Sequence, residues 1–203
     1  MARNTLATDV FDRTDANDLG ANWSPYTGSA QGQIFSNRVQ PLSVAISSGF
    51  EQYNAVTPAN NQWAGLQIIL LSNVGGYVNY AVYARLADPN TITGYLFAMQ
   101  NDQVFLGKQV AGSFTSLASV AHTYASTETL FLECVGTGLE GYINGTSVLT
   151  TTDSDIASGK TGLGWFADTG AATSDIVMDN FSMGDFTAGT ALVHRGLLLG
   201  VGI

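Results

Sequence analysis

The sequence predicts an all-β fold, a jelly-roll sandwich built from two stacked antiparallel sheets. Three observations support this prediction. Segments rich in β-branched, aromatic and alternating apolar residues follow one another along most of the 203-residue chain. Turn-forming residues separate these segments at short intervals, and the chain contains 23 glycines. No segment has a convincing helical pattern, which argues against the crossover helices of a parallel sheet.

Expected strands fill most of the first half of the chain. Each is rich in residues that favour extended backbone, as in the run Gln-Ile-Ile-Leu-Leu that ends at residue 71. Asn-Val-Gly-Gly at 73–76 and Asp-Pro-Asn at 88–90 are typical turn sequences and separate the later strands. The expected strands cover residues 6–11, 33–39, 42–46, 50–56, 63–71 and 77–86.

The second half continues the same pattern, with turns expected at 100–102 and 168–174. Trp165 lies between small residues that leave room for a large ring, so we expect it in the core. In 175–183 neither alternating set of residues is purely apolar, which predicts a strand covered on both sides for part of its length. The expected strands cover residues 92–99, 103–110, 129–135, 139–143, 146–150, 161–167 and 175–183.

The tripeptide Asn144-Gly145-Thr146 fits both a glycosylation acceptor and the corner of a β-hairpin. Glycosylation requires a secretory route, and the N-terminal residues contain no apolar segment of the kind that directs secretion. Asn-Gly supplies the two residues tolerant of positive φ that a type I′ turn needs. We therefore expect Asn144 and Gly145 to form the turn, with Ile143 opposite Thr146.

Charge and cysteine content exclude several classes of function. Seven basic and sixteen acidic residues give a net charge of −9, so a phosphate backbone or an anionic membrane surface is not expected as a direct partner. Cys134 is the only cysteine, which excludes an intrachain disulfide and a cysteine-based zinc site. It alternates with Leu130 and Leu132, so we expect it to be a small buried apolar residue.

The order of several segments resembles the concanavalin A-like lectin and glucanase superfamily, in particular its laminin-G-like jelly rolls. The resemblance covers about residues 6 to 186, and its most specific part is the Asn-Gly hairpin followed by Ser-Gly-Lys-Thr-Gly and a last strand carrying Asp-Asn-Phe. The segments that carry it are DVFDRTDANDLGANW at 9–23, WAGLQIIL at 63–70, 130–167 and DIVMDNFSM at 175–183.

We do not expect an enzyme. Glucanase members of this superfamily cleave sugars with paired carboxylates on one strand, and the Glu-x-Asp-x-x-Glu pattern is absent from the sequence. The histidines, His122 and His194, accompany no Gly-x-Ser-x-Gly nucleophile sequence. His122 is expected to be a residue on the surface of a strand.

The resemblance implies two kinds of ligand. Members often hold calcium at an edge of the sandwich, and the first and last strands commonly lie together, which would bring Asp9 near Asp179, with Asp12 or Asp175 close by. Alternatively, these acids cap turns or face water. No other cofactor is expected.

Sugar binding is the second implication, because lectin sites stack an aromatic ring on the apolar face of a sugar. The alternative is that these rings pack in the core. The candidate rings are Trp23, Tyr26, Trp63 and Tyr95, together with Tyr77 and Tyr83.

The C-terminal residues are unusually apolar for a segment that follows a complete sandwich. We divide the chain into a jelly-roll domain at 1–188 and an assembly tail at 189–203. The tail is too short to span a membrane, so it is expected either to bind another protein surface or to add an edge strand to its own sheet. The residues expected at this interface are Leu192, Val193, Leu197, Leu198, Leu199, Val201 and Ile203.

A jelly roll without a signal peptide or disulfide, with an apolar terminus, is similar in style to small proteins of tailed-phage virions. The function expected from the sequence is therefore that of a non-enzymatic capsid decoration protein, made in the host cytoplasm and located in the virion. Its expected partners are other capsid proteins and copies of itself. The alternative is a carbohydrate-binding module whose partner is a glycan.

Overall fold

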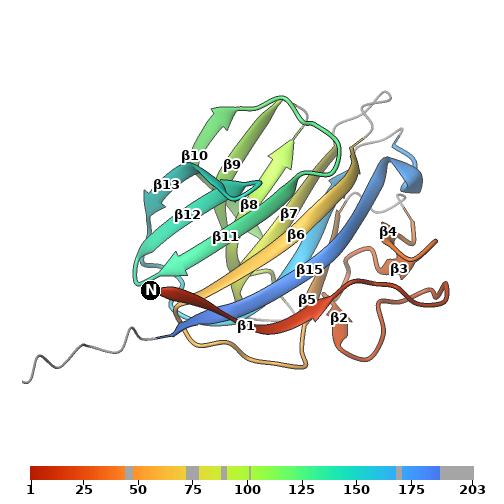
Figure 1. Ribbon diagram of the computed structural model, residues 1–203, viewed down its shortest axis with the longest axis horizontal. Coiled ribbons are helices and arrows are strands. Elements are labelled where there is room, and N and C mark those ends of the chain that lie inside the picture. The colour runs from red at the N-terminus through yellow and green to blue at the C-terminus, as the bar shows by residue number, and fades with distance from the viewer. Residues whose placement is uncertain (44–47, 72–77, 88–90, 101, 168–170, 188–203) are drawn as a thin grey trace, which may run out of the picture.

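The computed structural model describes residues 1–43, 48–71, 78–87, 91–100, 102–167 and 171–187. Two antiparallel sheets lie face to face as a sandwich, which confirms the fold class predicted from the sequence (Figure 1). A short 3-10 turn, η1 (Thr173–Asp175), is the single helical element among these residues. No described helix is long and apolar enough to cross a membrane.

The eight-stranded sheet lies toward the viewer in Figure 1. Its strands, in the order of hydrogen-bonded neighbours, are β13 (Thr146–Thr152), β12 (Gly138–Ile143), β11 (Thr129–Val135), β6 (Gln62–Leu71), β15 (Ile176–Thr187), β4 (Val39–Pro41) and β3 (Gly32–Ile34), with β1 (Ala2–Asp9) paired to β15 beside this path. The first and last strands therefore lie together, and Asp9 is opposite Phe181.

The seven-stranded sheet lies behind it. In the same order its strands are β10 (Ser113–Ala121), β9 (Gln103–Val110), β8 (Gly94–Gln100), β7 (Val78–Leu86), β14 (Lys160–Ala167), β5 (Ser48–Tyr53) and β2 (Trp23–Pro25). The strands β10 and β2 form the two edges of this sheet.

The core lies between the sheets and is formed by the inward side chains of both. On β11, Leu130, Leu132 and Cys134 are buried and alternate with half-exposed residues. Trp165 on β14 is also buried, so the predictions for Cys134 and Trp165 are confirmed. Burial raises the pKa of the Cys134 thiol to about 12, and the residue acts as a small apolar group.

The Asn-Gly sequence forms the predicted hairpin between β12 and β13. Asn144 has φ 50° and Gly145 has φ 80°, as a type I′ turn requires, and Ile143 pairs with Thr146. The Asn144 side chain accepts a hydrogen bond from the Thr129 N–H at 2.9 Å, which fixes the turn to the start of β11.

Two predicted elements differ from the structure. The single strand expected at 33–39 is the hairpin of β3 and β4, because Ser36 (φ 52°) and Asn37 (φ 62°) reverse the chain. The strand expected at 42–46 is not seen at 42–43, and 44–47 lie outside the described residues. The structure adds β2 and β10, which the sequence analysis did not predict.

The mixed pattern of β15 has two causes, the predicted cover on both sides at its start and a bulge further along. Ile176 and Met178 point into the core at its start, whereas Phe181 and Met183 do so further along. The change of phase occurs at a β-bulge, where Asn180 has φ 50° and the pairing with β6 shifts. At the start of β15 the strand is covered on both sides, because Val177, which points away from Ile176 and Met178, is also buried; beyond the bulge an extra residue turns the alternate side chains inward.

A buried arginine on β7 connects loops from distant parts of the chain. Arg85 has φ 54° and lies where the pairing of β7 with β14 is irregular. Its guanidinium donates hydrogen bonds to the backbone oxygens of Asn60 (3.1 Å), Ile156 (2.9 Å) and Gly136 (2.8 Å). Its positive charge also lies over the ring of Tyr95, 5.8 Å from the centroid.

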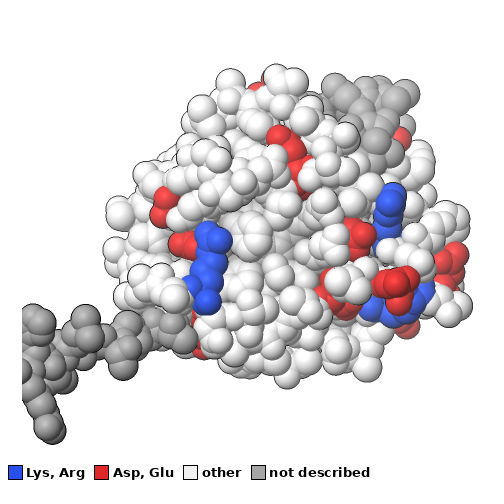
Figure 2. Space-filling model, viewed as in Figure 1, with Lys and Arg blue, Asp and Glu red and all other residues white. Residues whose placement is uncertain are grey.

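The outer face of the eight-stranded sheet is mostly uncharged, and Figure 2 shows a few acidic side chains that stand alone and others that lie beside a basic one. Arg3 forms one such pair with Glu133. Its guanidinium also lies over the rings of Phe131 and Tyr142, with distances of 5.1 and 5.0 Å to the centroids. The described basic residues of this face are thus mostly neutralised locally.

Candidate functional site

A hollow of about 410 Å³ opens on the outer face of the seven-stranded sheet. This side of the sheet is apolar although it faces away from the core: along β7, Ala81 and Tyr83 alternate with the core residues Tyr80 and Val82. Within the described parts of the chain, no residue that lines the hollow carries a charge. The lining residues are Ser48, Phe50, Asn79, Ala81, Tyr83, Ile92, Leu96, Phe105, Gln109, Gly112, Phe114, Trp165 and Phe166.

Small residues create the space for the rings that surround the hollow. Gly164 lies on β14 between β5 and β7, and a Cβ atom there would lie 2.9 Å from the Tyr83 ring and 3.1 Å from the Phe50 ring. These two rings contact each other edge to face, with centroids 5.7 Å apart. Glycine at position 164 therefore allows both rings to lie against the sheet.

The most accessible ring is on the edge strand β10. Phe114 is 51% exposed, and its ring packs edge to face on Phe105 of β9 at 5.6 Å. A Cβ atom at Gly107 would lie 2.6 Å from the Phe114 ring, so this glycine lets the ring lie over β9. One side of the hollow is thus formed by the Phe114 ring, which is fixed by its packing on Phe105 but remains accessible to a ligand.

Polar groups surround the same space. The Tyr83 hydroxyl donates a hydrogen bond of 3.0 Å to the Gln109 side-chain oxygen. Burial, together with the neighbouring Tyr26, raises the pKa of Tyr83, which keeps the hydroxyl protonated as a donor. Ser48 and Asn79 add further donors and acceptors. Aromatic rings combined with uncharged amides and hydroxyls suit an uncharged ligand that has both apolar surface and hydroxyl groups.

The rings predicted to bind sugar mostly lie elsewhere. Trp23, Tyr26, Trp63 and Tyr95 are at most 6% exposed, so none offers a face on which a sugar could stack, and that prediction is corrected. They are buried because each packs within an apolar cluster or makes an internal hydrogen bond, such as that from Tyr95 to the Asp153 carboxylate at 2.6 Å. Tyr77 lies outside the described residues.

Tyr83 is the one described ring of the wider predicted set that lines the hollow. Phe50, Phe105 and Phe114 were missed. In the sequence Phe50 and Phe105 resemble core residues, and Phe114 lies on a strand that was not predicted. The sequence pattern that could have indicated this site is a pair of aromatic residues on neighbouring strands with a glycine between them.

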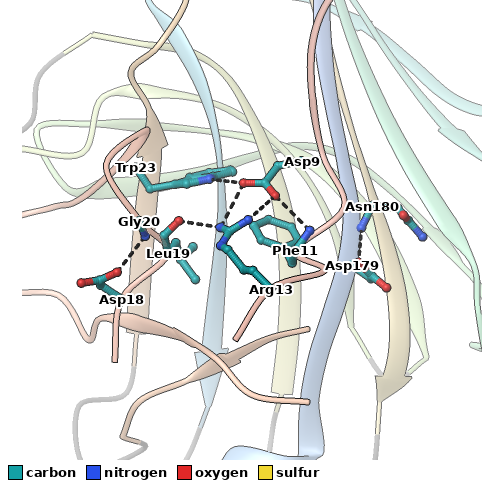
Figure 3. A network of polar contacts seen from close by, with 9 residues as sticks. All are labelled: Asp9, Phe11, Arg13, Asp18, Leu19, Gly20, Trp23, Asp179 and Asn180. Carbon is teal, nitrogen blue, oxygen red and sulfur yellow. Dashed lines mark hydrogen bonds and ion pairs between the residues drawn. The ribbon is translucent and has the colours of Figure 1, made fainter. Parts of the chain in front are cut away.

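The predicted calcium ligand Asp9 already has a full set of partners (Figure 3). Its carboxylate accepts hydrogen bonds from the Phe11 N–H (2.9 Å), the Trp23 indole (2.8 Å) and both terminal nitrogens of Arg13 (2.7 and 3.1 Å). The guanidinium compensates its charge. In the structure Asp9 is therefore an acid that fixes the loop after β1, and calcium binding at Asp9 stays a prediction.

Asp179 does not join this network. Its carboxylate accepts a hydrogen bond from the Asn180 N–H at 2.8 Å, at the bulge in β15 (Figure 3). Burial, with Asp12 and Asp9 nearby, raises the pKa of Asp179. Among the described residues, no group of three or more histidine, cysteine, aspartate or glutamate side chains is arranged to hold a metal ion.

The remaining predicted residues are only partly described. His122 follows β10 and contacts the Glu128 carboxylate at 3.0 Å, a pairing that the sequence did not reveal. His194 lies outside the described residues. So do the predicted assembly residues Leu192, Val193, Leu197, Leu198, Leu199, Val201 and Ile203.

Solved structures with the same architecture include both binding modules and enzymes. The carbohydrate-binding module CBM66 from Bacillus subtilis matches with a TM-score of 0.62 and 17% identity, over 78% of this chain and 91% of the module. The endo-β-1,3-glucanase from Pyrococcus furiosus matches with a TM-score of 0.61 and 10% identity, over 92% and 96% of the two chains. The CBM2 module of Lactobacillus casei BL23 phage J-1 evolved Dit has a TM-score of 0.59 and 10% identity, over 89% and 95%.

These neighbours are concanavalin A-like jelly rolls, which confirms the resemblance at the level of the fold. No family model matches the chain, and no curated protein matches it in sequence. Because one fold supports many functions, the function has to be argued from the residues of the site.

Proposed function

We propose that this protein is a non-catalytic carbohydrate-binding module that binds its glycan in the hollow lined by Phe50, Tyr83, Phe105 and Phe114. The observation that carries the proposal is the half-exposed ring of Phe114 beside uncharged amide and hydroxyl groups. A sugar ring stacks on such a face through its C–H groups, and its hydroxyls bond to the neighbouring amides.

The chemistry of the lining favours binding over hydrolysis. Glycosidic cleavage uses a pair of carboxyl groups beside the scissile bond, and the described residues that line this hollow include no aspartate or glutamate. The fold is shared with a carbohydrate-binding module as well as with a glucanase, so the fold itself is compatible with either role. The absence of carboxylates at the site is the reason for proposing a binding role.

The virion role predicted from the sequence rests on the tail at 189–203, which lies outside the described residues. Nothing among the described residues supports capsid attachment. The alternative named in the sequence analysis, a carbohydrate-binding module, is therefore the function proposed here.

The proposal is tested by replacing Phe114 with alanine and measuring binding to a panel of soluble polysaccharides by affinity electrophoresis and calorimetry. We expect roughly a tenfold loss of affinity, because one stacked ring contributes on the order of 1 kcal/mol beyond its buried area. Phe35→Ala is the matched control, since Phe35 is 49% exposed but follows β3 of the other sheet.

Equal binding by wild type and Phe114→Ala would refute this assignment of the site. The same polysaccharides are incubated with the wild-type protein and assayed for new reducing ends. Release of reducing sugar would contradict the non-catalytic role.

A further inference from the structure

A second hollow, of about 430 Å³, has a different chemical character from the first. Hydroxyl and amide groups form much of its lining, and Lys160 at the start of β14 is the one charged side chain among the described residues that line it. The residues that line it are Ser24, Gln52, Asn54, Thr57, Leu86, Ala87, Gly159 and Lys160.

The two hollows share the outer face of the seven-stranded sheet. Phe50 lines the first and Gln52 the second, and these residues are two positions apart on β5, a separation of about 7 Å. Likewise, Tyr83 and Leu86 of β7 belong to the same outer apolar cluster, and each lines one of the hollows. A single oligosaccharide lying across β5, β14 and β7 would therefore contact both.

Lys160 is held toward the second hollow by neutral groups. Its ammonium donates a hydrogen bond of 2.8 Å to the Asn54 side-chain oxygen, and the Asn54 amide donates in turn to the Ser24 hydroxyl at 2.6 Å. The Gln52 amide is fixed by a 3.2 Å hydrogen bond to the Leu86 carbonyl. The bonds through Asn54 orient the Lys160 ammonium without neutralising its charge.

Although the chain has a net charge of −9, Lys160, like Arg38 and Arg85, forms no ion pair among the described residues. Arg3, Arg13 and Lys108 each form an ion pair with a carboxylate. For Lys160 there is no carboxylate within ion-pair distance in the described parts of the chain. A half-buried ammonium with only a neutral partner retains its attraction for an anion.

Gly159 explains why this lysine can lie so close to β7. Its φ is 149°, and a Cβ atom there would lie 2.4 Å from the Leu86 carbonyl oxygen. Only glycine permits this approach of the two backbones. The position of Lys160 in the hollow is thus fixed by the backbone on one side and by Asn54 on the other.

We infer that the glycan carries an anionic substituent, a carboxylate or a sulfate, which binds at Lys160 while a neutral sugar unit occupies the aromatic hollow. This inference rests on the proposed function. Lysine is suited to either anion, because its ammonium acts as a compact charge with several hydrogen-bond donors. The side chains of Asn54, Thr57 and Ser24 would supply further hydrogen bonds to the substituent.

The test uses the neutral glycan selected in the Phe114 experiment, prepared in three forms: unmodified, oxidised at C6 to a carboxylate, and sulfated at C6. Calorimetry on the full chain should show that at least one acidic form binds tenfold or more tightly than the neutral form at low salt. This gain should shrink as salt is added. Comparison of the two acidic forms identifies the anion.

Lys160→Gln should abolish the difference in affinity between the acidic and neutral forms, and Lys160→Arg should retain this difference. Arg38→Gln, which removes the same charge from an exposed position on the turn between β3 and β4, should behave like wild type. Equal binding of acidic and neutral forms by wild type, or a gain that survives Lys160→Gln, would overturn the inference but leave the proposed function standing.

If no neutral glycan binds, the proposed function fails, and the anion site is judged separately. Sodium glucuronate and sodium sulfate are then titrated into the protein while the Lys160 ammonium signal is followed by nuclear magnetic resonance. A saturable shift in wild type that is retained in Arg38→Gln supports an anion site. An unchanged signal overturns it.

Discussion

Glu51 on β5 places a carboxyl group in the core, where it is 1% exposed and accepts a 2.8 Å hydrogen bond from the Gly32 N–H. Burial raises its pKa from 4.5 to about 7; the Gly32 N–H opposes this rise, and the charge of Asp18 adds to it. The folded protein therefore holds this proton more tightly than the unfolded chain. The resulting stability is complete below pH 4.5 and is lost as the pH rises through about 7.

From this group alone, we expect the free energy of unfolding to fall by about 3 kcal/mol between pH 4.5 and pH 8. Glu51→Gln keeps an acceptor for Gly32 but cannot ionise, so it should remove this fall and be more stable than wild type at about pH 8. Urea denaturation across this range measures the effect, with the half-exposed Glu140→Gln as control. The same pH dependence in wild type and Glu51→Gln would show that Glu51 is not the titrating group.

The burial of individual residues could be predicted only where the residues are apolar. Trp165 and Cys134 lie in the core as expected, because alternation and ring size indicate it. Glu51 and Arg85 were not predicted, because charged residues in strands usually face water. At 50–52, hydrophobicity alone would turn the Phe50 side chain into the core and the Glu51 side chain toward water. The structure shows the reverse, because the outer face of this sheet is itself apolar and accommodates Phe50.

At the scale of elements, the hairpin of β12 and β13 depends on its two turn residues. Replacing Asn144-Gly145 with Ala-Ala should destabilise the protein by about 1–2 kcal/mol, because alanine is strained at positive φ and the Asn144 bond to Thr129 is lost. Chemical denaturation measures this difference. We expect no glycan on Asn144, so mass spectrometry of the native protein showing an added sugar would contradict the assignment of this tripeptide to a turn.

The elements show why some local features could not be predicted. The Asn-Gly turn was identified because this pair is nearly specific for one turn type, whereas the Ser36-Asn37 turn was missed because neither residue is a glycine. The mixed pattern of β15 is visible in the sequence, but the bulge at Asn180 is not, since asparagine tolerates positive φ without requiring it. The strand β10 was missed because its side chains are exposed or half-exposed throughout.

At the scale of the whole molecule, the predicted division after residue 188 can be tested directly. Every described strand ends by Thr187, and both hollows are built from residues before 167. A chain without residues 189–203 should therefore keep its β-sheet circular dichroism, its melting temperature within a few degrees and its glycan affinity. If the shortened chain unfolds, the predicted domain boundary after residue 188 is wrong.

Sedimentation of the two forms tests the predicted assembly role of the tail. If the tail binds a neighbouring subunit, self-association of the full chain should be lost in the shortened one. Equal sedimentation of both forms would contradict an assembly role.

The location of Phe114 on β10 bears on how such a protein can change over evolutionary time. Only Leu117 and Ala118 of the β10 side chains pack against the core described here, so mutations at the other positions of this strand leave it almost untouched. Under the proposed function, Phe114 can therefore vary at little cost in stability, whereas Phe50, Tyr83 and Phe105 belong to a buried cluster and contribute to both stability and binding. A lineage carrying this sandwich could acquire a new glycan preference through a few substitutions in one edge strand, without compensating changes elsewhere.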